Sequence, residues 1–205
     1  MEKKQIIRFT QALTELVIDG KKDMTRRFTS DRRQYEVGER VAIAQAYGFI
    51  WRSMNAMPDQ QIAYMRRLRR ELAVEHPSTL PAWENKLFVR PELMQYEIEI
   101  TGKREEHLQD ITDEDIMREG VIHGMMSCKD IETGEVGDFT WIDIKRKRLP
   151  NGKYHVSIRH NVNSNARDCF IDMIDHICGK GTWESNPSVY AYTFKVIDLY
   201  PKFTE

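Results

Sequence analysis

The chain has 205 residues, of which 40% are hydrophobic and 10% aromatic, which excludes a disordered protein and fits one globular domain. Its formal net charge of −1 gives no overall attraction to nucleic acid, so any such binding must come from local basic patches. The sequence shows no apolar run of membrane-spanning length and no signal-type start, so we expect a cytoplasmic protein without a membrane partner.

The first predicted element is a helix over residues 7–19, where apolar residues recur at helical spacing and Gly20 provides a stop. The basic stretch that follows is expected to be a loop or a short strand. Residues 37–40 are typical of a turn, and an apolar strand is predicted over residues 41–47.

A basic amphipathic helix is predicted over residues 58–75. Its apolar stripe comprises Ile62, Met65, Leu68 and Leu72. The faces between carry Arg66, Arg67, Arg69 and Arg70. Such a helix could lie on nucleic acid, or it could be a solvated lid packed on the domain, which is the interpretation we favour.

The middle of the chain combines strand and helix signals. Residues from Tyr96 to 101 alternate apolar and polar, which predicts a strand within 93–101. A helix is predicted over 113–119, with Thr112 as its N-cap and Gly120 as its stop.

A basic hairpin is predicted from strands at 139–144 and 154–158, joined through a turn at 150–152. The connection carries four candidate nucleic-acid contacts, Lys145, Arg146, Lys147 and Arg148. The neighbouring aromatic residues Phe139, Trp141 and Tyr154 could stack on bases or lie in the core of a sheet, and the sequence leaves both interpretations open.

The last elements predicted are a helix over 164–178 capped by Ser164, a turn at 183–187 and a strand over 189–199. The expected buried stripe of the helix is Phe170, Ile171, Ile174, Ile177 and Cys178. Strands mixed with unevenly spaced helices favour an α+β fold with a mostly antiparallel sheet or small barrel.

Cysteine and histidine residues show no pattern typical of a metal site. The three cysteines, Cys128, Cys169 and Cys178, are irregularly spaced, which indicates reduced thiols. None lies in a zinc-ligand pattern with histidine, so we expect neither a metal nor another cofactor.

Residues 20–27 carry the strongest functional signal. Lys22, Thr25 and Arg27 follow the first helix at fixed spacing, and Lys21 and Arg26 add positive charge. A lysine among like charges is less stable in its protonated form, so it could act as a base toward the neighbouring hydroxyl. A dense cationic loop is also suited to binding phosphate.

The chain resembles the ASCH domain family, a branch of the PUA-like fold, whose signature Gly-x-Lys-x-x-Thr-x-Arg follows an N-terminal helix. Gly20, Lys22, Thr25 and Arg27 match this signature in full. Similarities to the family, especially to its phage and prophage branch, continue in order along the chain at residues 37–41, 108–120, 179–187 and 190–196.

The resemblance implies a small, mostly antiparallel β-barrel with surrounding helices, and a cleft lined by the signature. It implies RNA or a nucleotide derivative as the ligand. The ligand-binding residues implied are Gly20, Lys21, Arg26, Arg27, Trp183 and Asn186. The chain is longer than compact members of the family, which predicts one domain over 1–205 with insertions at about 52–82 and 128–160.

Some bacterial members of the family are amidohydrolases that act on N4-acylated cytidine, and their catalytic residues correspond to Lys22, Thr25 and Glu119. In that chemistry Lys22 takes the proton of Thr25, whose oxygen attacks the acyl carbon. Arg27 or backbone N–H groups would stabilise the oxyanion, and Glu119 would orient Lys22 or pass a proton to the leaving amine. The arginines lower the pKa of Lys22 and the Glu119 carboxylate raises it, so its direction stays open.

Three functions therefore stand as hypotheses. Binding of RNA or a nucleotide derivative comes first because it requires only the charge pattern. Hydrolysis of an acylated nucleoside comes second because it requires a geometry of Lys22, Thr25 and Glu119. A phage-encoded structural or interaction protein, suggested by the two insertions, is the third.

Overall fold

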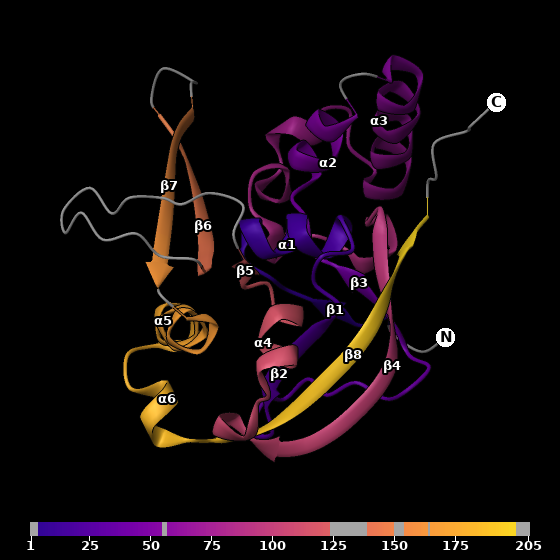
Figure 1. Cartoon of the computed structure of the whole chain (residues 1–205). Helices are drawn as coiled ribbons and strands as arrows, with labels where there is room; N and C mark the ends of the chain where they lie inside the picture. Colours follow the sequence, from indigo (N-terminus) through magenta and orange to yellow (C-terminus); the bar gives the residue numbers. More distant parts are fainter. Residues whose placement is uncertain (1–3, 55–56, 124–138, 150–153, 164, 200–205) are drawn as a thin grey trace. The chain divides into compact units, whose positions relative to one another are not determined.

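The computed structural model describes residues 4–54, 57–123, 139–149, 154–163 and 165–199 (Figure 1). The fold is α+β, as predicted. The chain divides into two compact units, the first comprising residues 1–8, 40–98 and 197–205, and the second residues 9–39 and 99–196. Among the helices of the described segments, none is long and apolar enough to cross a bilayer.

The first unit is mainly helical. Its strands are β1 (Ile6–Ile7) and β3 (Arg40–Ile43), and its helices are α2 (Tyr47–Ser53) and α3 (Pro58–Leu72). Short 3-10 turns follow at Pro77–Thr79, Pro81–Trp83, Lys86–Phe88 and Pro91–Leu93.

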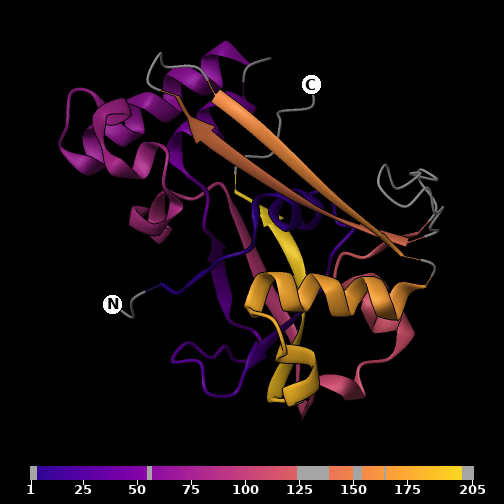
Figure 2. The same ribbon diagram turned by 90° about the vertical axis from the view of Figure 1, so that its left-hand side faces the viewer.

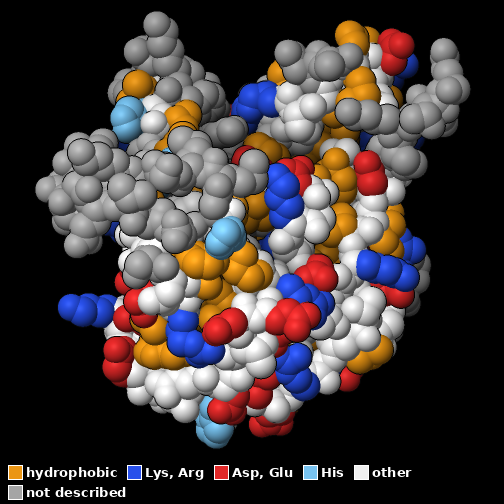
Figure 3. All heavy atoms as spheres, in the orientation of Figure 1, with side chains coloured by type: hydrophobic (Ala, Val, Ile, Leu, Met, Phe, Trp, Pro, Cys, Tyr) orange, Lys and Arg blue, Asp and Glu red, His pale blue; other side chains and the backbone are white. Residues whose placement is uncertain are grey.

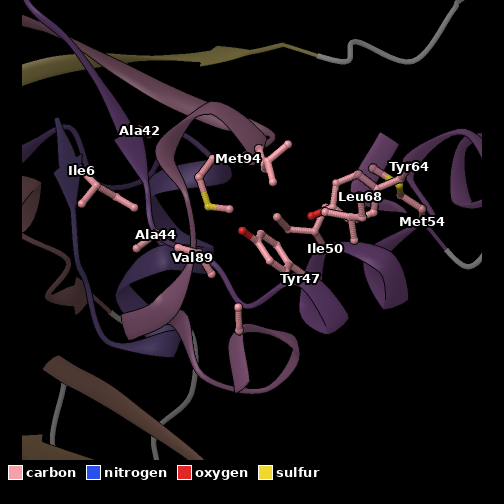
Figure 4. Close-up of a cluster of buried hydrophobic side chains, with 12 residues drawn as sticks. Ile6, Ala42, Ala44, Tyr47, Ile50, Met54, Tyr64, Leu68, Val89 and Met94 are labelled. Atoms are coloured by element: carbon pink, nitrogen blue, oxygen red, sulfur yellow. The ribbon is translucent and has the colours of Figure 1, made fainter. Parts of the chain in front are cut away.

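A hydrophobic cluster holds the first unit together (Figure 4). Tyr47 and Ile50 of α2 contribute to it, as do Tyr64 and Leu68 of α3. The sequence did not predict α2. The residue before the helix, Ala46, has no side chain that could cap it, and the apolar pattern predicted a strand over residues 41–47.

The second unit contains most of the remaining elements. Its helices are α1 (Gln11–Ile18), α4 (Asp113–Arg118), α5 (Ala166–Cys178) and α6 (Thr182–Ser185), with a 3-10 turn at Leu108–Asp110. Its strands are β2 (Met24–Phe28), β5 (Ile122–His123), β6 (Phe139–Arg148) and β7 (Tyr154–Asn163). Strands β4 (Tyr96–His107) and β8 (Ser188–Asp198) contribute residues to both units.

The described strands form two open sheets. One has the order β1-β3-β4-β8-β2 and includes a parallel pair, β1 with β3; the other has the order β5-β6-β7 and is antiparallel. The described residues close no barrel, because β1 and β2 remain edge strands of an open sheet. In the second sheet, β6 and β7 form a long two-stranded ribbon (Figure 2).

Two predicted helices differ from the observed ones in detail. The helix predicted over 7–19 begins only at Gln11, because Ile6 and Ile7 pair with β3 and Thr10 caps the helix. In α5 the capping side chain is Asn165, and the predicted cap Ser164 lies outside the described residues. The buried residues of α5 are Cys169, Phe170 and Met173, whereas Ile177, expected in the stripe, is 40% exposed.

Of the two predicted insertions, the stretch at about 52–82 contains α3 and the 3-10 turn at Pro77–Thr79. The one at about 128–160 includes most of the β6–β7 ribbon. The turn predicted at 150–152 lies outside the described residues.

Candidate functional site

The end of α1 sets the course of the signature. Gly20 has φ +71°, a conformation that favours glycine, and the N–H groups of Lys21 and Lys22 both donate to the Leu16 carbonyl, at 2.9 and 3.1 Å. The helix thereby ends in a tight turn, and the next residues enter β2. The basic motif is therefore part turn and part strand, as predicted.

Lys22 is buried, with its side chain 1% exposed. Its Nζ donates three hydrogen bonds, to Glu119 Oε2 at 2.6 Å, to the Glu119 carbonyl at 2.7 Å and to the Met24 carbonyl at 2.7 Å. An ammonium group has three N–H donors, so all of them are engaged. The predicted contact between Lys22 and Glu119 is thus present in the structure.

Burial lowers the pKa of Lys22 below its usual value. The Glu119 carboxylate raises it through charge and hydrogen bonding but does not cancel the effect of burial, and Arg27 and Arg26 lower it further. The direction that the sequence left open is therefore downward.

Arg26 shares Glu119 with Lys22 and also bonds two further carboxylates. Its guanidinium donates to Glu106 Oε1 at 2.7 Å, to Asp115 Oδ2 at 3.0 Å and to Glu119 Oε1 at 3.1 Å. Arg104 also bonds Asp115, and it bonds Glu106 at 2.5 Å. We call these six residues the charge network: Lys22, Arg26, Arg104, Glu106, Asp115 and Glu119.

The charge network is balanced in charge. It contains three cations and three carboxylates, and Lys22, Arg26, Asp115 and Glu119 are all buried. Buried charges are costly unless each is paired and hydrogen-bonded, and the contacts of Lys22, Arg26, Asp115 and Glu119 meet that condition. Lys22 and Arg26, expected to face a ligand, are engaged inside the protein.

Helix α4 positions two of the carboxylates. The Thr112 Oγ accepts a hydrogen bond from the Asp115 N–H at 3.2 Å, which confirms the predicted cap. Asp115 and Glu119 are four residues apart, so they lie on the same side of the helix and both reach Arg26. Arg118 anchors the same helix to Asp23, next to the signature, with bonds of 2.8 and 3.0 Å.

The other face of β2 has a different character. Side chains alternate along a strand, so Thr25 and Arg27 lie on the face opposite Arg26. The register pairs Thr25 with Tyr192 and Arg27 with Tyr190 of β8, so these four residues share one face of the sheet. We call Thr25, Arg27, Tyr190 and Tyr192 the Thr25 face.

Further aromatic and cationic side chains contact the Thr25 face. The Arg27 guanidinium lies 5.4 Å from the ring centroid of Phe9, and Lys103 Nζ lies 4.6 Å from that of Tyr190. Tyr192 and Thr25 are buried, whereas Arg27 and Tyr190 are partly exposed. The face therefore combines positive charge with aromatic rings, some of which reach solvent.

The three predicted catalytic residues are only partly brought together. Lys22 and Glu119 are in contact, and Thr25 belongs to β2, the strand that follows Lys22. Within the described residues, no hydrogen bond joins the Thr25 hydroxyl to Lys22. Lys21 is exposed and lies 3.8 Å from Asp19, its nearest carboxylate partner.

Trp183 and Asn186 contact the turn before α4. The Trp183 carbonyl accepts from the Gln109 side chain at 2.9 Å, and Asn186 Oδ1 accepts from the Gln109 N–H at 2.8 Å. The Trp183 ring packs edge-on against Phe170. The contacts of these two residues thus connect α6 to the residues that lead into α4.

The predicted nucleic-acid residues lie on β6. Lys145 and Lys147 are exposed, and Lys145 Nζ lies 3.5 Å from Asp143; the side chains of Arg146 and Arg148 lie outside the description. Trp141 is 3% exposed and packs against the His176 ring, so of its two interpretations the core one is correct. On the face drawn in Figure 3, acidic and basic side chains are interspersed.

Sequence reasoning missed Glu106, Arg104, Asp115 and Tyr190. A signal existed for Asp115, which stands three residues after the Thr112 cap, but it was used only to predict the helix. The alternation of β4 places Arg104 and Glu106 on one face, yet nothing in the sequence indicates which strand they meet. No cluster of metal-ligating side chains occurs in the part of the chain that the structure describes.

Comparison with known proteins identifies no relative: no family model, curated protein or solved structure matches the chain.

Proposed function

We propose that this chain is an ASCH-type member of the PUA-like fold that binds RNA or a nucleotide derivative at the Thr25 face. The observation that carries the proposal is the register of β2 and β8, which groups Arg27 with Tyr190 and Tyr192. An arginine beside aromatic rings can contact a phosphate while a base stacks on a ring.

The charge network supports the proposal through Arg26, which lies on the opposite face of β2. Arg26 is fixed by three carboxylates, so the strand that carries Thr25 and Arg27 is held in place. A site held by a rigid scaffold loses less entropy when it binds a ligand. Lys22 and Arg26 thus act as positioning residues in this account, and Arg27 contacts the ligand.

Titration of a fluorescein-labelled single-stranded RNA with the protein at several salt concentrations tests the proposal. Arg27→Ala should weaken binding about tenfold, and the affinity should fall as salt rises. Lys195→Ala is the matched control, because Lys195 is an exposed cation on the other face of β8. Equal affinities of wild type and Arg27→Ala, or an affinity that ignores salt, would contradict the proposal.

A second candidate is hydrolysis of an N4-acylated cytidine by Lys22, Thr25 and Glu119. The 2.6 Å contact of Lys22 with Glu119 and the lowered pKa of Lys22 favour it. Lys22 would have to exchange one of its three hydrogen bonds for the Thr25 hydroxyl before it could take that proton. The Thr25 oxygen would then attack the acyl carbon, the amine would leave with a proton, and water would release the acid from Thr25.

Incubation with N4-acetylcytidine, followed by chromatography of the products, tests this second function. Cytidine and acetate should form in equal amounts, Thr25→Ala should abolish the reaction, and Thr25→Ser should retain part of it. Absence of cytidine from the wild-type reaction, or full activity of Lys22→Ala, would rule the hydrolase out.

A further inference from the structure

The first unit contains a pocket that the proposed function does not use. It has a volume of about 390 Å³ and lies between α2 and α3, lined by Trp51, Gln61, Ile62, Met65, Arg66 and Arg69. Gln61 connects α3 to α2 beside the pocket, because its Nε2 donates to the Trp51 carbonyl at 3.0 Å. The Trp51 ring also packs against the Trp83 ring in a tilted arrangement, with ring centroids 6.0 Å apart.

Two arginines of this pocket differ from the others on α3. Arg67 donates to the Glu92 carbonyl, and Arg70 pairs with its neighbour Glu71 at 2.8 Å. The guanidinium groups of Arg66 and Arg69, by contrast, have no hydrogen-bond or ion-pair partner among the described residues, and both side chains are exposed. They stand three residues apart, so their guanidinium groups are neighbours on one side of the helix.

The remaining lining is apolar. Ile62, which the sequence placed in the apolar stripe of the helix, is 49% exposed, and the buried residues of α3 in the hydrophobic cluster are Tyr64 and Leu68. The apolar residues of α3 therefore serve two surfaces. Tyr64 and Leu68 hold the helix on the core, Ile62 lines the pocket with the two arginines, and Met65 packs against the cluster and also lines the pocket.

We infer that this pocket binds a single phosphorylated nucleoside, either free or within a single strand of nucleic acid. Arg66 and Arg69 would hold the phosphate, and the base would pack against Trp51, Ile62 and Met65. The volume lies in the range of small-ligand sites, which run from about 300 to 1,000 Å³.

Equilibrium titration of the full chain with adenosine 5′-monophosphate and with a uridine hexanucleotide tests the inference. The double variant Arg66→Ala/Arg69→Ala should weaken binding of at least one probe tenfold or more. Arg70→Ala removes one charge from the same helix outside the pocket and should change affinity less than twofold. The probe whose affinity falls in the double variant identifies the ligand. A loss for adenosine 5′-monophosphate indicates a free nucleotide, and a loss for the hexanucleotide alone indicates a single strand.

Titrations repeated in the Arg27→Ala background separate this site from the Thr25 face, because adding Arg66→Ala/Arg69→Ala to that background should still weaken binding tenfold or more. The inference is overturned if neither probe binds, if the double variant binds both as tightly as wild type, or if inorganic phosphate binds as tightly as adenosine 5′-monophosphate. The last result would show that the apolar lining takes no part.

Discussion

Glu119 contacts both buried cations of residues 20–27, Lys22 and Arg26. Removal of one partner of a buried ion pair leaves the others uncompensated in a medium where charge is costly. We therefore expect Glu119→Ala to lower the free energy of unfolding by about 3 kcal/mol. Urea denaturation followed by circular dichroism measures this change.

Glu114→Ala is the control for that experiment, because Glu114 lies exposed on the same helix, α4. Its loss should cost less than about 1 kcal/mol, the usual contribution of an exposed acid near a helix N-terminus. Equal effects of the two variants would show that burial of the charge network contributes nothing to stability.

Asp115 provides a prediction for pH dependence. Burial alone would raise the pKa of Asp115, but hydrogen bonds from Arg104 and Arg26 lower it below its usual value. The unfolded chain therefore takes up the proton at a higher pH, about 3.9, than the folded chain does. The stabilisation by Asp115 should be complete well above pH 4 and be lost as the pH falls through the folded value.

The free energies of unfolding of wild type and Asp115→Asn, measured across a pH series, check this prediction. Near neutral pH the variant should be about 2 kcal/mol less stable, as expected for hydrogen bonds to a charged group. The difference should shrink as the pH falls below 4. A difference that is constant from pH 7 to pH 2 would contradict the role given to the charged carboxylate.

For individual residues, the sequence predicted which side chains belong to the site more accurately than it predicted their roles. The resemblance implied that Glu119 acts next to Lys22, and the structure contains a contact between these two residues. The same reasoning placed Arg26 at a ligand, whereas it bonds three carboxylates. Local charge density cannot show this, because the carboxylates come from segments about 80 to 90 residues away.

Among the elements, α5 shows how a cap fixes the start of a helix. The Asn165 side chain accepts from the Asp168 N–H at 2.8 Å. Asn165→Ala should reduce stability by about 1 kcal/mol, whereas Asn165→Asp keeps an acceptor and should remain near wild type. Thermal denaturation of the three proteins decides this, and an Ala variant as stable as wild type would argue against the assigned cap.

Helix α2 contains a glycine that is required by packing. A Cβ at Gly48 would lie 2.7 Å from both Nε1 and the carbonyl oxygen of Trp83. Gly48→Ala should therefore cost about 1–3 kcal/mol, although alanine is about 1 kcal/mol better than glycine inside a helix. Chemical denaturation measures the net change in the free energy of unfolding, and a variant more stable than wild type would contradict the packing described.

Elements with strong local signals were predicted well. Helices α3 and α4 each carry a clear period or a cap, and their predicted bounds agree with the structure to within three residues at each end. Strand β4 begins where the alternation begins, at Tyr96, but it continues six residues beyond the predicted end at residue 101. Helices α2 and α6 were missed, because residues 47–53 lack a capping side chain and α6 has only four residues. The face that a helix buries also depends on its neighbours, as Ile177 and Ile62 show.

For the whole molecule, the mixture of strand and helix patterns was enough to predict an α+β fold. Sheet order was not predictable, because pairing of β2 with β8 joins residues more than 160 positions apart. The two strands β4 and β8 run through both compact units. We therefore expect the units to unfold together, in one calorimetric transition whose van't Hoff and calorimetric enthalpies agree; two separated transitions would contradict this.

The central claim is that ligand binding takes place at the Thr25 face of β2 and β8. Ultraviolet crosslinking of a 4-thiouridine-substituted single-stranded RNA, followed by mass spectrometry of the crosslinked peptides, tests it most directly. We expect crosslinks in the peptides that carry Arg27 and Tyr190. Crosslinks confined to the β6–β7 ribbon or to α3, or no crosslink at all, would contradict it.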